Sequence, residues 1–384
     1  MKKNSVCAII NLAGHETRLH PLTKQRPIAA LPFAGRYRII DFSLSAISSA
    51  HINSVAIFIE ESGRAIYDHV RSGREWDLHG AVSGGIFTFS QQRRKLADFL
   101  MLETGERYYE NQRIFIDRSE ADYVLIMEGD AVHNVDVKAL TKFHQQRDAE
   151  ITIAYKSIPT EKTKTYKADE YYRIDDEDYL EGVMLGNTKE EERHAIDGHV
   201  YLVNKEVLFD IFDRAEAGNL FVDIGSLIRS YSLLYRTSMY EYTGYLEVIN
   251  SLSSYYAANM SMLEPTNLNA LFKGSNTINT RSKSGVPTYY AESASVHNAE
   301  LATGCIIEGS VDSSIISRKS SVAPNAHVSN SIIHSGVKVC EGARVEYAII
   351  EKGAVVQPNA VVVGTKYAPI IIGKGACVEC QDTL

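Results

Sequence analysis

A 17-residue repeat in the last part of the chain limits the fold more than any other feature of the sequence. Each period has inward-type residues at three places, separated by steps of 6, 5 and 6 residues. The successive sets are Cys305, Val311 and Ile316; Val322, Val328 and Ile333; Val339, Val345 and Ile350; and Val356 and Val362. In a parallel β-helix each coil stacks one inward residue per face on the coil before it. The repeat therefore predicts a parallel β-helix over residues 286–384 and disfavours the alternative, a β-sandwich with regular spacing.

Residues 1–255 have a different pattern, in which short apolar runs alternate with helical segments. The runs expected to be strands are apolar on both faces: Val6–Ile10, Ser54–Ile59, Tyr123–Met127, Ile151–Ala154 and Gly198–Val203. Two expected helices are Asp41–Ser49 and Val137–Arg147. This alternation predicts a three-layer, Rossmann-like α/β domain with a sheet buried on both faces and ligands at the carboxyl ends of the strands. Residues 256–285 are the expected connector.

Composition excludes several classes of function. Among 384 residues, 40 are Lys or Arg and 48 are Asp or Glu, which gives a net charge of −8. Such an acidic chain is not a general nucleic-acid binder, although a local basic pocket for a phosphorylated small molecule remains open. No apolar run has the length of about 20 residues that a membrane helix needs. The five scattered cysteines indicate a reducing compartment, so we expect a cytoplasmic protein without a membrane partner.

The segment after the first expected strand carries a recognisable motif. Asn11–Ser45 resembles the opening of the sugar-phosphate nucleotidyltransferases, and most closely that of the bacterial ADP-glucose pyrophosphorylases. Three further segments, His69–Leu78, Gly84–Gln91 and Leu125–Asp136, are similar to segments of the same family. The resemblance covers almost the whole chain, and it implies a nucleotidyltransferase-type domain followed by a left-handed parallel β-helix.

The resemblance also implies a reaction. Such enzymes join ATP and glucose 1-phosphate into ADP-glucose and pyrophosphate. Catalysis in this chemistry is mainly positioning and neutralisation of phosphate charge. It requires a glycine-rich loop, cationic side chains and Mg²⁺ held by carboxylates. Asp130 matches one metal-binding aspartate of the family.

The chain departs from the family pattern in the phosphate loop. The family loop Gly-Gly-x-Gly-x-Arg matches Ala13, Gly14, His15, Glu16, Thr17 and Arg18. Glu16 introduces a Cβ and a negative charge at a glycine position, which disfavours a polyphosphate. Ile28 replaces the lysine of the next motif, Arg-Ala-Lys-Pro. Arg18 and Arg26 remain as candidate anion-binding residues, with a structural ion pair as the alternative.

The matched metal site is also incomplete. Counting back eleven residues from Asn259 places Val248 where the family has its second metal aspartate. Glu247 is adjacent and could supply a carboxylate only through a shift of one residue. We therefore expect no metal site, and we interpret Asp130 as a remnant of one. A lost preorganised electrostatic contact costs roughly 3–4 kcal/mol of transition-state stabilisation, so several losses make catalysis negligible.

A retained fold with lost catalytic charges resembles the GlgD-type, non-catalytic regulatory subunit of the family. This resemblance implies a catalytic partner subunit, a hetero-oligomer that is expected to be a tetramer, and Mg²⁺ and ATP bound by the partner alone. Three other functions remain open: an active adenylyltransferase with divergent ligands, a sugar-nucleotide-binding protein without a partner, and a hexapeptide acyltransferase. The last would use His327 or His334 of the expected β-helix as a base.

Overall fold

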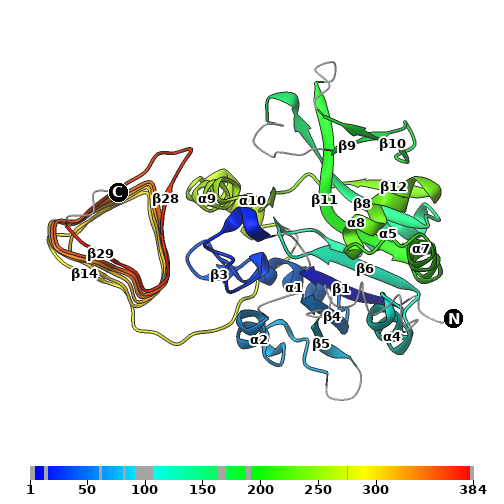
Figure 1. Ribbon diagram of the computed structural model, residues 1–384, viewed down its shortest axis with the longest axis horizontal. Coiled ribbons are helices and arrows are strands. Elements are labelled where there is room, and N and C mark those ends of the chain that lie inside the picture. Colours follow the sequence, from blue (N-terminus) through cyan, green and yellow to red (C-terminus); the bar gives the residue numbers. More distant parts are fainter. Residues whose placement is uncertain are drawn as a thin grey trace. The chain divides into compact units, whose positions relative to one another are not determined.

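A computed structural model gives the fold of the chain (Figure 1). It describes residues 5–12, 16–59, 63–80, 84–90, 107–162, 170–186, 192–274 and 276–380. The chain divides into two compact units. Unit 1 consists of Met1–His15, Ile40–Val248 and Gly274–Asn279. Unit 2 consists of Glu16–Ile39, Ile249–Lys273 and Thr280–Leu384. No helix in the described ranges is long and apolar enough to cross a membrane.

A mixed β-sheet forms the centre of unit 1, and its main strand order is β10-β9-β11-β6-β1-β4-β5. β1 is parallel to β4 and β6, whereas β11 is antiparallel to β6 and β8. The expected strands are confirmed, most of them with extended ends. The strands are β1 (Val6–Leu12), β4 (Ser54–Ile59), β5 (Gly85–Ser90), β6 (Tyr123–Glu128), β8 (Ile151–Pro159), β9 (Glu170–Ile174), β10 (Leu180–Leu185), β11 (Arg193–Asn204) and β12 (Thr237–Glu241).

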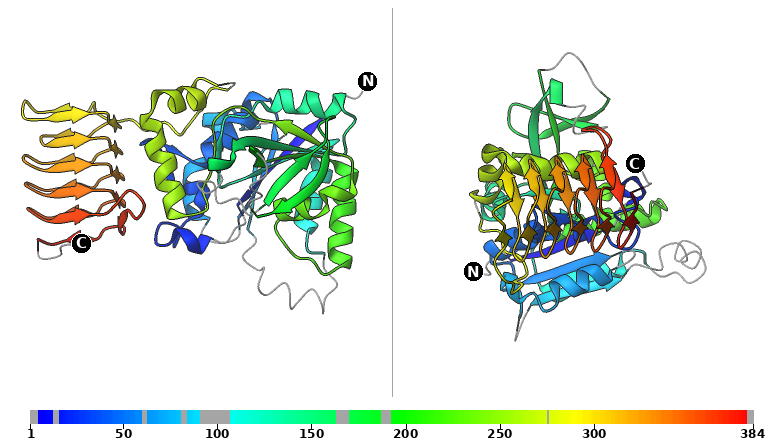
Figure 2. Two further views of the ribbon diagram at one scale, coloured as in Figure 1. Left: turned by 90° about the horizontal axis from the view of Figure 1, so that it is seen from above. Right: turned by 90° about the vertical axis from the view of Figure 1, so that its left-hand side faces the viewer.

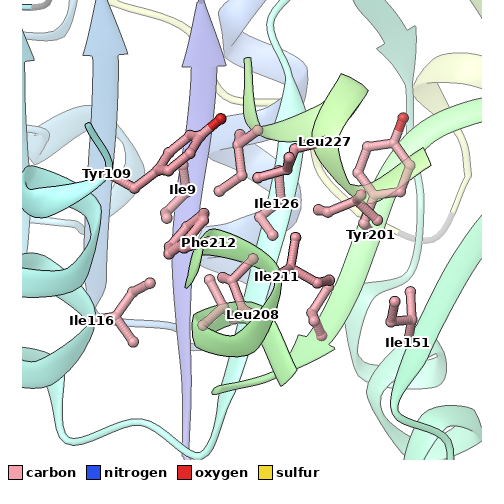
Figure 3. Packing of buried hydrophobic residues seen from close by; sticks show 14 of the residues in the cluster. Ile9, Tyr109, Ile116, Ile126, Ile151, Tyr201, Leu208, Ile211, Phe212 and Leu227 are labelled. Atoms are coloured by element: carbon pink, nitrogen blue, oxygen red, sulfur yellow. The ribbon is translucent and has the colours of Figure 1, made fainter. Parts of the chain in front are cut away.

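Helices pack against the sheet, and the expected segments Asp41–Ser49 and Val137–Arg147 are indeed helical. The helices of unit 1 are α1 (Ile40–Ser49), α2 (Arg64–Val70), α4 (Glu110–Ser119), α5 (Val137–Gln146), α7 (Lys205–Ala217) and α8 (Ile224–Tyr231). Figure 3 shows α7 residues Leu208, Ile211 and Phe212 packed beside Ile9 and Ile126 of the sheet. This cluster also contains side chains of α4 and α8.

The alternate residues of the central strands face the other side of the sheet and are also buried. Ile10 and Leu125 have no exposed surface. On α5, His144 contacts the sheet through a 2.7 Å hydrogen bond between its Nδ1 and the hydroxyl of Thr152. The sheet is therefore buried on both faces, as continuous rather than alternating apolar strands predict.

The C-terminal part of unit 2 is the expected left-handed parallel β-helix. Figure 1 looks down its axis onto a triangular cross-section, and Figure 2 shows the coils stacked from the yellow first coil to the red last one. The strands of the first face are β14 (Tyr289–Tyr290), β17 (Ile306–Ile307), β20 (Ser321–Val322), β23 (Lys338–Val339), β26 (Val355–Val356) and β29 (Cys377–Val378). Those of the second are β15 (Ser295–His297), β18 (Ser310–Asp312), β21 (His327–Ser329), β24 (Arg344–Glu346) and β27 (Val361–Val363). Those of the third are β16 (Glu300–Leu301), β19 (Ile315–Ile316), β22 (Ile332–Ile333), β25 (Ala348–Ile350) and β28 (Ile370–Ile372).

The strand register confirms the 17-residue repeat. Val311 pairs with Val328, Val328 with Val345, and Val345 with Val362. Each of these four residues is at most 1% exposed. The repeat read from the sequence is therefore the inward row of one face of the β-helix.

Unit 2 also contains two segments that precede the β-helix in sequence, Glu16–Ile39 and Ile249–Lys273. Helix α9 (Leu252–Met260) contacts the β-helix through Tyr255 and Tyr256, whose hydroxyls lie 3.1 Å from Nε2 of His334 and 2.5 Å from the backbone O of Asn330. Each compact unit therefore combines segments that are separate in the chain, whereas the predicted boundaries at residues 255 and 285 divide the chain into consecutive domains. The reason is that buried tyrosines attach α9 to the β-helix. Helix α10 (Pro265–Phe272) follows in the same unit.

Candidate functional site

Polar side chains meet at the carboxyl ends of β1 and β6, two neighbouring parallel strands of unit 1. Asn11 of β1 donates from Nδ2 to Oε2 of Glu128 over 2.9 Å and to Oδ1 of Asp223 over 3.4 Å. Asp223 also caps α8, because its carboxylate accepts a 2.9 Å hydrogen bond from the backbone N–H of Ser226. These side chains form one network at the edge of the sheet where ligands of α/β proteins bind.

Glu128 is a buried carboxyl group in this network. It is 7% exposed, and its Oε1 has no hydrogen-bond partner in the described part of the chain. Burial and the nearby carboxylates of Asp223 and Asp130 raise the pKa of Glu128 to about 8. The group is therefore mostly protonated at pH 7 and adds no negative charge to the folded site.

Gly225, in the first turn of α8, leaves room for the Glu128 carboxyl group. A Cβ built on Gly225 would lie 1.6 Å from Oε1 of Glu128. We expect Gly225→Ala to lower the free energy of unfolding by about 1–2 kcal/mol, because the carboxyl group must move. Chemical denaturation measures this. In a Glu128→Ala background the same change should instead stabilise slightly, since alanine is a better helix former by about 1 kcal/mol. An equal loss in both backgrounds would contradict the prediction.

Asp130 forms an ion pair with a histidine that the sequence analysis did not single out. Oδ1 of Asp130 lies 2.7 Å from Nδ1 of His199, and the two side chains are 29% and 18% exposed. Burial alone would raise the pKa of Asp130, but the charge of His199 and the hydrogen bond outweigh it and lower that pKa. Burial also opposes protonation of His199, yet Asp130 raises the pKa of His199 to about 9. The pair is therefore ionised at neutral pH.

An irregularity in β11 brings His199 to this position. The pairing of β11 with β8 shifts register between Asp197 and Tyr201, and His199 has a φ of 60°. A Cβ on Gly198 would lie 2.6 Å from the backbone O of Ala154, so the close approach of the two strands requires glycine there. A glycine inside an apolar strand is the sequence signal of such a bulge, and it stands directly before His199.

The other cation at the site is also bound by neighbouring side chains. Arg229 of α8 donates from Nη1 to Oδ2 of Asp197 over 3.1 Å and to the hydroxyl of Tyr201 over 2.6 Å. Its Nη2 donates to the hydroxyl of Ser226 over 2.9 Å. Arg229 is therefore held within the protein and is not directed at a ligand.

Val248 lies beside the end of β6, where a metal aspartate would be needed. β13 (Leu246–Val248) pairs antiparallel with β7 (Ala131–His133), and Val248 is opposite Ala131, the residue after Asp130. Glu247 is opposite Val132, and its side chain points to the other face because successive residues of a strand alternate.

The donors at this point do not fit Mg²⁺. The ion requires several oxygen ligands in near-octahedral geometry. Here one carboxylate is already bonded to a histidine and the neighbouring position is aliphatic. Over the whole described part of the chain, no three His, Cys, Asp or Glu residues are grouped so that they could hold a metal ion.

The predicted loop positions are only partly described. Ala13 and Gly14 lie outside the described residues, as does the side chain of Glu16, which begins the short helix η1 (Glu16–Leu19). Ile28 begins η2 (Ile28–Ala30) in unit 2 and is 8% exposed. Its apolar side chain is buried, so it offers nothing to a phosphate.

The two candidate anion-binding arginines have different surroundings in unit 2. Arg18 is exposed. Arg26 forms an ion pair from Nη2 with Glu351 of the β-helix and donates from Nε to the backbone O of Leu22 over 2.9 Å. Its side chain is 20% exposed and that of Glu351 is 8% exposed. Arg26 thus takes part in the structural ion pair that the sequence left open as the alternative.

A basic cluster that the sequence analysis did not find lies in unit 2. We define it as Arg36, Arg38, Arg281, Lys283, Arg318 and Lys352. Burial, followed by the charges of Arg38, Arg318, Arg281 and Lys352, lowers the pKa of Lys283. Burial and Arg36 lower the pKa of Arg318, whose Nε is buried without a hydrogen-bond partner among the described residues. Nearby, burial raises the pKa of Glu300 to about 7 against the charge of Arg36. An anion would relieve this crowding of like charges.

The two histidines considered as bases of an acyltransferase are bound to other side chains. His334 is 1% exposed and contacts Tyr255, and its pKa is lowered to about 3 by burial and by Arg26. Nδ1 of His327 lies 2.7 Å from the hydroxyl of Ser310. A base must reach its substrate, so His334 is unsuited to that role.

Comparison with known proteins shows what the chain resembles. Residues 7–174 match the model of nucleotidyl transferases, and residues 286–368 match that of the GlmU-like C-terminal hexapeptide. The glycogen biosynthesis protein GlgD of Bacillus subtilis is 28% identical, over 98% of this chain and 97% of its own length. A glucose-1-phosphate adenylyltransferase of Mycoplasma mobile is 28% identical over 90% of this chain and 86% of its own. One of Fusobacterium nucleatum is 28% identical over 85% of each. The chain is thus similar along nearly its whole length to proteins of the ADP-glucose pyrophosphorylase family.

These similarities confirm the resemblance to the ADP-glucose pyrophosphorylases and the fold class predicted from the sequence. The chain is related along nearly its whole length both to a protein named for glycogen biosynthesis and to glucose-1-phosphate adenylyltransferases. The chemistry of the site depends on the particular residues of the strand-end network. We use this name for the linked side chains of Asn11, Glu128, Asp130, Asp197, His199, Asp223 and Arg229.

Sequence reasoning found Asp130 and Val248 but missed most of the network around them. Asn11, Glu128, Asp197, His199 and Asp223 are polar residues within or next to apolar strands and helix starts. Such interruptions of a buried strand were the available signal, because a buried polar group needs a partner. The partners lie up to 212 residues apart in the chain, so the pairing itself could not be read from spacing.

Proposed function

We propose that this chain is a regulatory, largely non-catalytic subunit of bacterial ADP-glucose pyrophosphorylase. In this proposal it activates a catalytic partner that makes ADP-glucose from ATP and glucose 1-phosphate for glycogen synthesis. The observation that carries the proposal is the ion pair of Asp130 with His199 beside Val248. It removes a carboxylate from metal binding at the place where the reaction requires one.

The charge of the strand-end network supports the same conclusion. Asp130, Asp197 and Asp223 are acidic groups, and the two cations, His199 and Arg229, are hydrogen-bonded to protein side chains. Among the residues that the structure describes, a triphosphate entering here would meet carboxylates and no uncommitted cation. Since one lost preorganised contact costs roughly 3–4 kcal/mol of transition-state stabilisation, we expect little or no turnover by this chain alone.

The proposal assigns the chemistry to the partner. The catalytic subunit would bind Mg²⁺ and ATP, and this chain would associate with it in a hetero-oligomer, expected to be a tetramer, in the cytoplasm. The relative named for glycogen biosynthesis supports the pathway, and the adenylyltransferases support the class of partner.

The experiment compares ADP-glucose synthesis by the pure chain, by a glucose-1-phosphate adenylyltransferase from the same cells, and by their mixture. We expect the chain alone to be at least about 10³-fold slower than the partner, since two or more contacts are missing. The mixture should exceed the partner alone. Strong activity of the pure chain would instead establish the second candidate, an active glucose-1-phosphate adenylyltransferase. An unchanged rate in the mixture would remove the regulatory role.

The proposal includes a phosphorylated metabolite, and the basic cluster of unit 2 is its candidate site. The charges of four cationic side chains of the cluster act on Lys283, and that of Arg36 acts on Arg318 and Glu300, so these side chains lie close enough to repel one another. In the mixture assay, a sugar phosphate should change the rate with the natural chain and change it much less with Lys283→Glu. Lys366→Glu, in the loop after β27, is the matched control and should respond like the natural chain.

A further inference from the structure

One column of residues on the third face of the β-helix begins with a carboxyl group and continues with isoleucines. Glu300 pairs in register with Ile315, Ile315 with Ile332, and Ile332 with Ile349. The core of the β-helix contains the residues next to them, such as Ile316, so this column faces outward. Yet its three isoleucines are 0%, 2% and 0% exposed, which means that the column is covered. Glu300 therefore stands at a position where the following coils have a buried isoleucine.

A turn of the segment Glu16–Ile39 covers the start of this column. Gly35 of the turn has a φ of 63°. A Cβ built on Gly35 would lie 3.6 Å from Oε1 of Glu300 and 3.6 Å from Cγ2 of Ile315. The Glu300 carboxyl group is thus directly beneath the turn, and Arg36, the next residue of the turn, brings a positive charge to it.

The Glu300 carboxyl group is not satisfied at this position. Its Oε2 is buried and accepts no hydrogen bond within the part of the chain that the structure describes. Burial raises the pKa of Glu300 to about 7, although the charge of Arg36 lowers it. An ionised carboxylate that is buried in this way is costly, and isoleucine would avoid the cost. A residue that breaks the local packing pattern without a gain in stability indicates a functional position.

The charged groups that act on Glu300 and on its surroundings are the cations of the basic cluster. Arg36 acts on Glu300 and also on Arg318. Nε of Arg318 is buried and, like Oε2 of Glu300, has no hydrogen-bond partner among the described residues. The groups that act on Lys283 are Arg38, Arg318, Arg281 and Lys352. An anion among these cations is attracted by them and repelled by an ionised Glu300, whereas a protonated Glu300 adds no charge.

We propose that the Glu300 carboxyl group makes anion binding at the basic cluster depend on pH. The cluster binds an anion more tightly when Glu300 is protonated, and the anion takes up a proton as it binds. This inference rests on the part of the proposed function that places a phosphorylated metabolite at the basic cluster. It adds the residue that regulates this site.

Calorimetric titration of the full-length chain with sulfate tests the proposal. Sulfate keeps both negative charges between pH 6 and pH 8.5, so a change in affinity reports on the protein. We expect the dissociation constant to be about tenfold higher at pH 8.5 than at pH 6. Glu300→Gln should bind at pH 8.5 as tightly as the natural chain does at pH 6. Glu292→Gln, which changes an exposed carboxyl group of the same coil, is the matched control and should keep the tenfold difference.

Proton uptake by the natural chain gives a readout that does not depend on a variant folding. Titration at pH 7.5 in two buffers with different enthalpies of ionisation measures the number of protons bound with each sulfate. We expect about half a proton per sulfate, because pH 7.5 lies just above the pKa of free Glu300, which anion binding raises. Sulfate binding without proton uptake would overturn the proposal.

Two variants separate this inference from the proposed anion site. A pH dependence that persists unchanged in Glu300→Gln would overturn the inference and assign the effect to Lys283, whose pKa is lowered by burial and neighbouring charges. An affinity that is independent of pH but is lost in Lys283→Glu would also overturn it, and would leave the anion site in place. Absence of sulfate binding at pH 6, or binding that survives Lys283→Glu, would overturn the anion site and the inference together.

Discussion

Replacing Glu128 by glutamine is expected to stabilise the protein by about 4–5 kcal/mol at pH 8 and to leave its stability at pH 4 unchanged. The pKa of Glu128 is about 8 in the folded state, because of burial and of the nearby Asp223 and Asp130. In the unfolded chain it is near 4.3. A group whose pKa is raised by folding contributes its full stability when the pH is below its pKa in the unfolded chain. It loses this contribution as the pH rises through its pKa in the folded protein. Glutamine has no proton to lose, so Glu128→Gln avoids this loss.

Urea denaturation of the natural chain and of Glu128→Gln between pH 4 and pH 9 measures the effect. The difference in free energy of unfolding should grow from pH 5 upward and level off above pH 8. Glu206→Gln on the exposed side of α7 is the matched control and should show no such growth. A constant difference across the range would mean that the Glu128 carboxyl group is already ionised in the folded protein at neutral pH.

Removing the Asp130 carboxylate is expected to lower the free energy of unfolding by about 2–3 kcal/mol at pH 6. The ion pair raises the pKa of His199 to about 9 and lowers that of Asp130. The ion pair therefore contributes its full stability between roughly pH 4 and pH 6.5, which are the pKa values of aspartate and histidine in the unfolded chain. This contribution is lost as the pH rises through about 9, the pKa of His199 in the folded protein. Asp130→Ala should differ from the natural chain at pH 6 and approach it in stability at pH 9.5.

A double-mutant cycle separates the pair from other effects of the substitution. Asp130→Ala, His199→Ala and the double variant should show a coupling of about 2 kcal/mol at pH 6. The exposed pair of Asp117 with Lys205, at 2.6 Å and with Asp117 58% exposed, is the control and should give less than about 1 kcal/mol. A coupling of the same size at pH 6 and pH 9.5 would contradict the ionised state of the pair, as would a His199 pKa near 6.5 by NMR.

The fold could be predicted from the sequence because its main elements have local patterns. Each coil of the β-helix contributes the same inward row, so its repeat persists from Val311 to Val362. The strands of unit 1 are buried on both faces, and this makes runs such as Ser54–Ile59 continuously apolar. Helix α5 begins where Asp136 accepts a 3.0 Å hydrogen bond from Ala139, a cap that is also visible in the sequence.

The candidate site was predictable only where it matches a known motif. Asp130 and Val248 were found by alignment with the family. His199 reaches Asp130 through a bulge, and the ionisation of this pair depends on burial as well as on residue type. Asn11 and Glu128 meet because β1 and β6 are neighbours in the sheet, although 117 residues separate them. Spacing along the chain carries no information about such contacts.

The division into units was not predictable for a similar reason. The sequence changes character near residue 285, and this change marks where the repeat begins. It does not mark which earlier segments pack against the repeat. Arg26 and Tyr255 both lie within the predicted α/β domain, yet their partners Glu351 and His334 are in the β-helix. Composition alone cannot assign a helix to the core that it covers.

The attachment of α9 to the β-helix has a consequence for the evolution of this architecture. Tyr255 and Tyr256 are 0% and 4% exposed, and Tyr256 donates to the backbone of Asn330. A gene fusion that exchanged the hexapeptide region at residue 285 would strip these aromatic rings of their cover. Recombination would therefore have to transfer residues 249–273 together with the C-terminal region. The inherited module is larger than its repeat and includes a helix that carries no trace of the repeat in its own sequence.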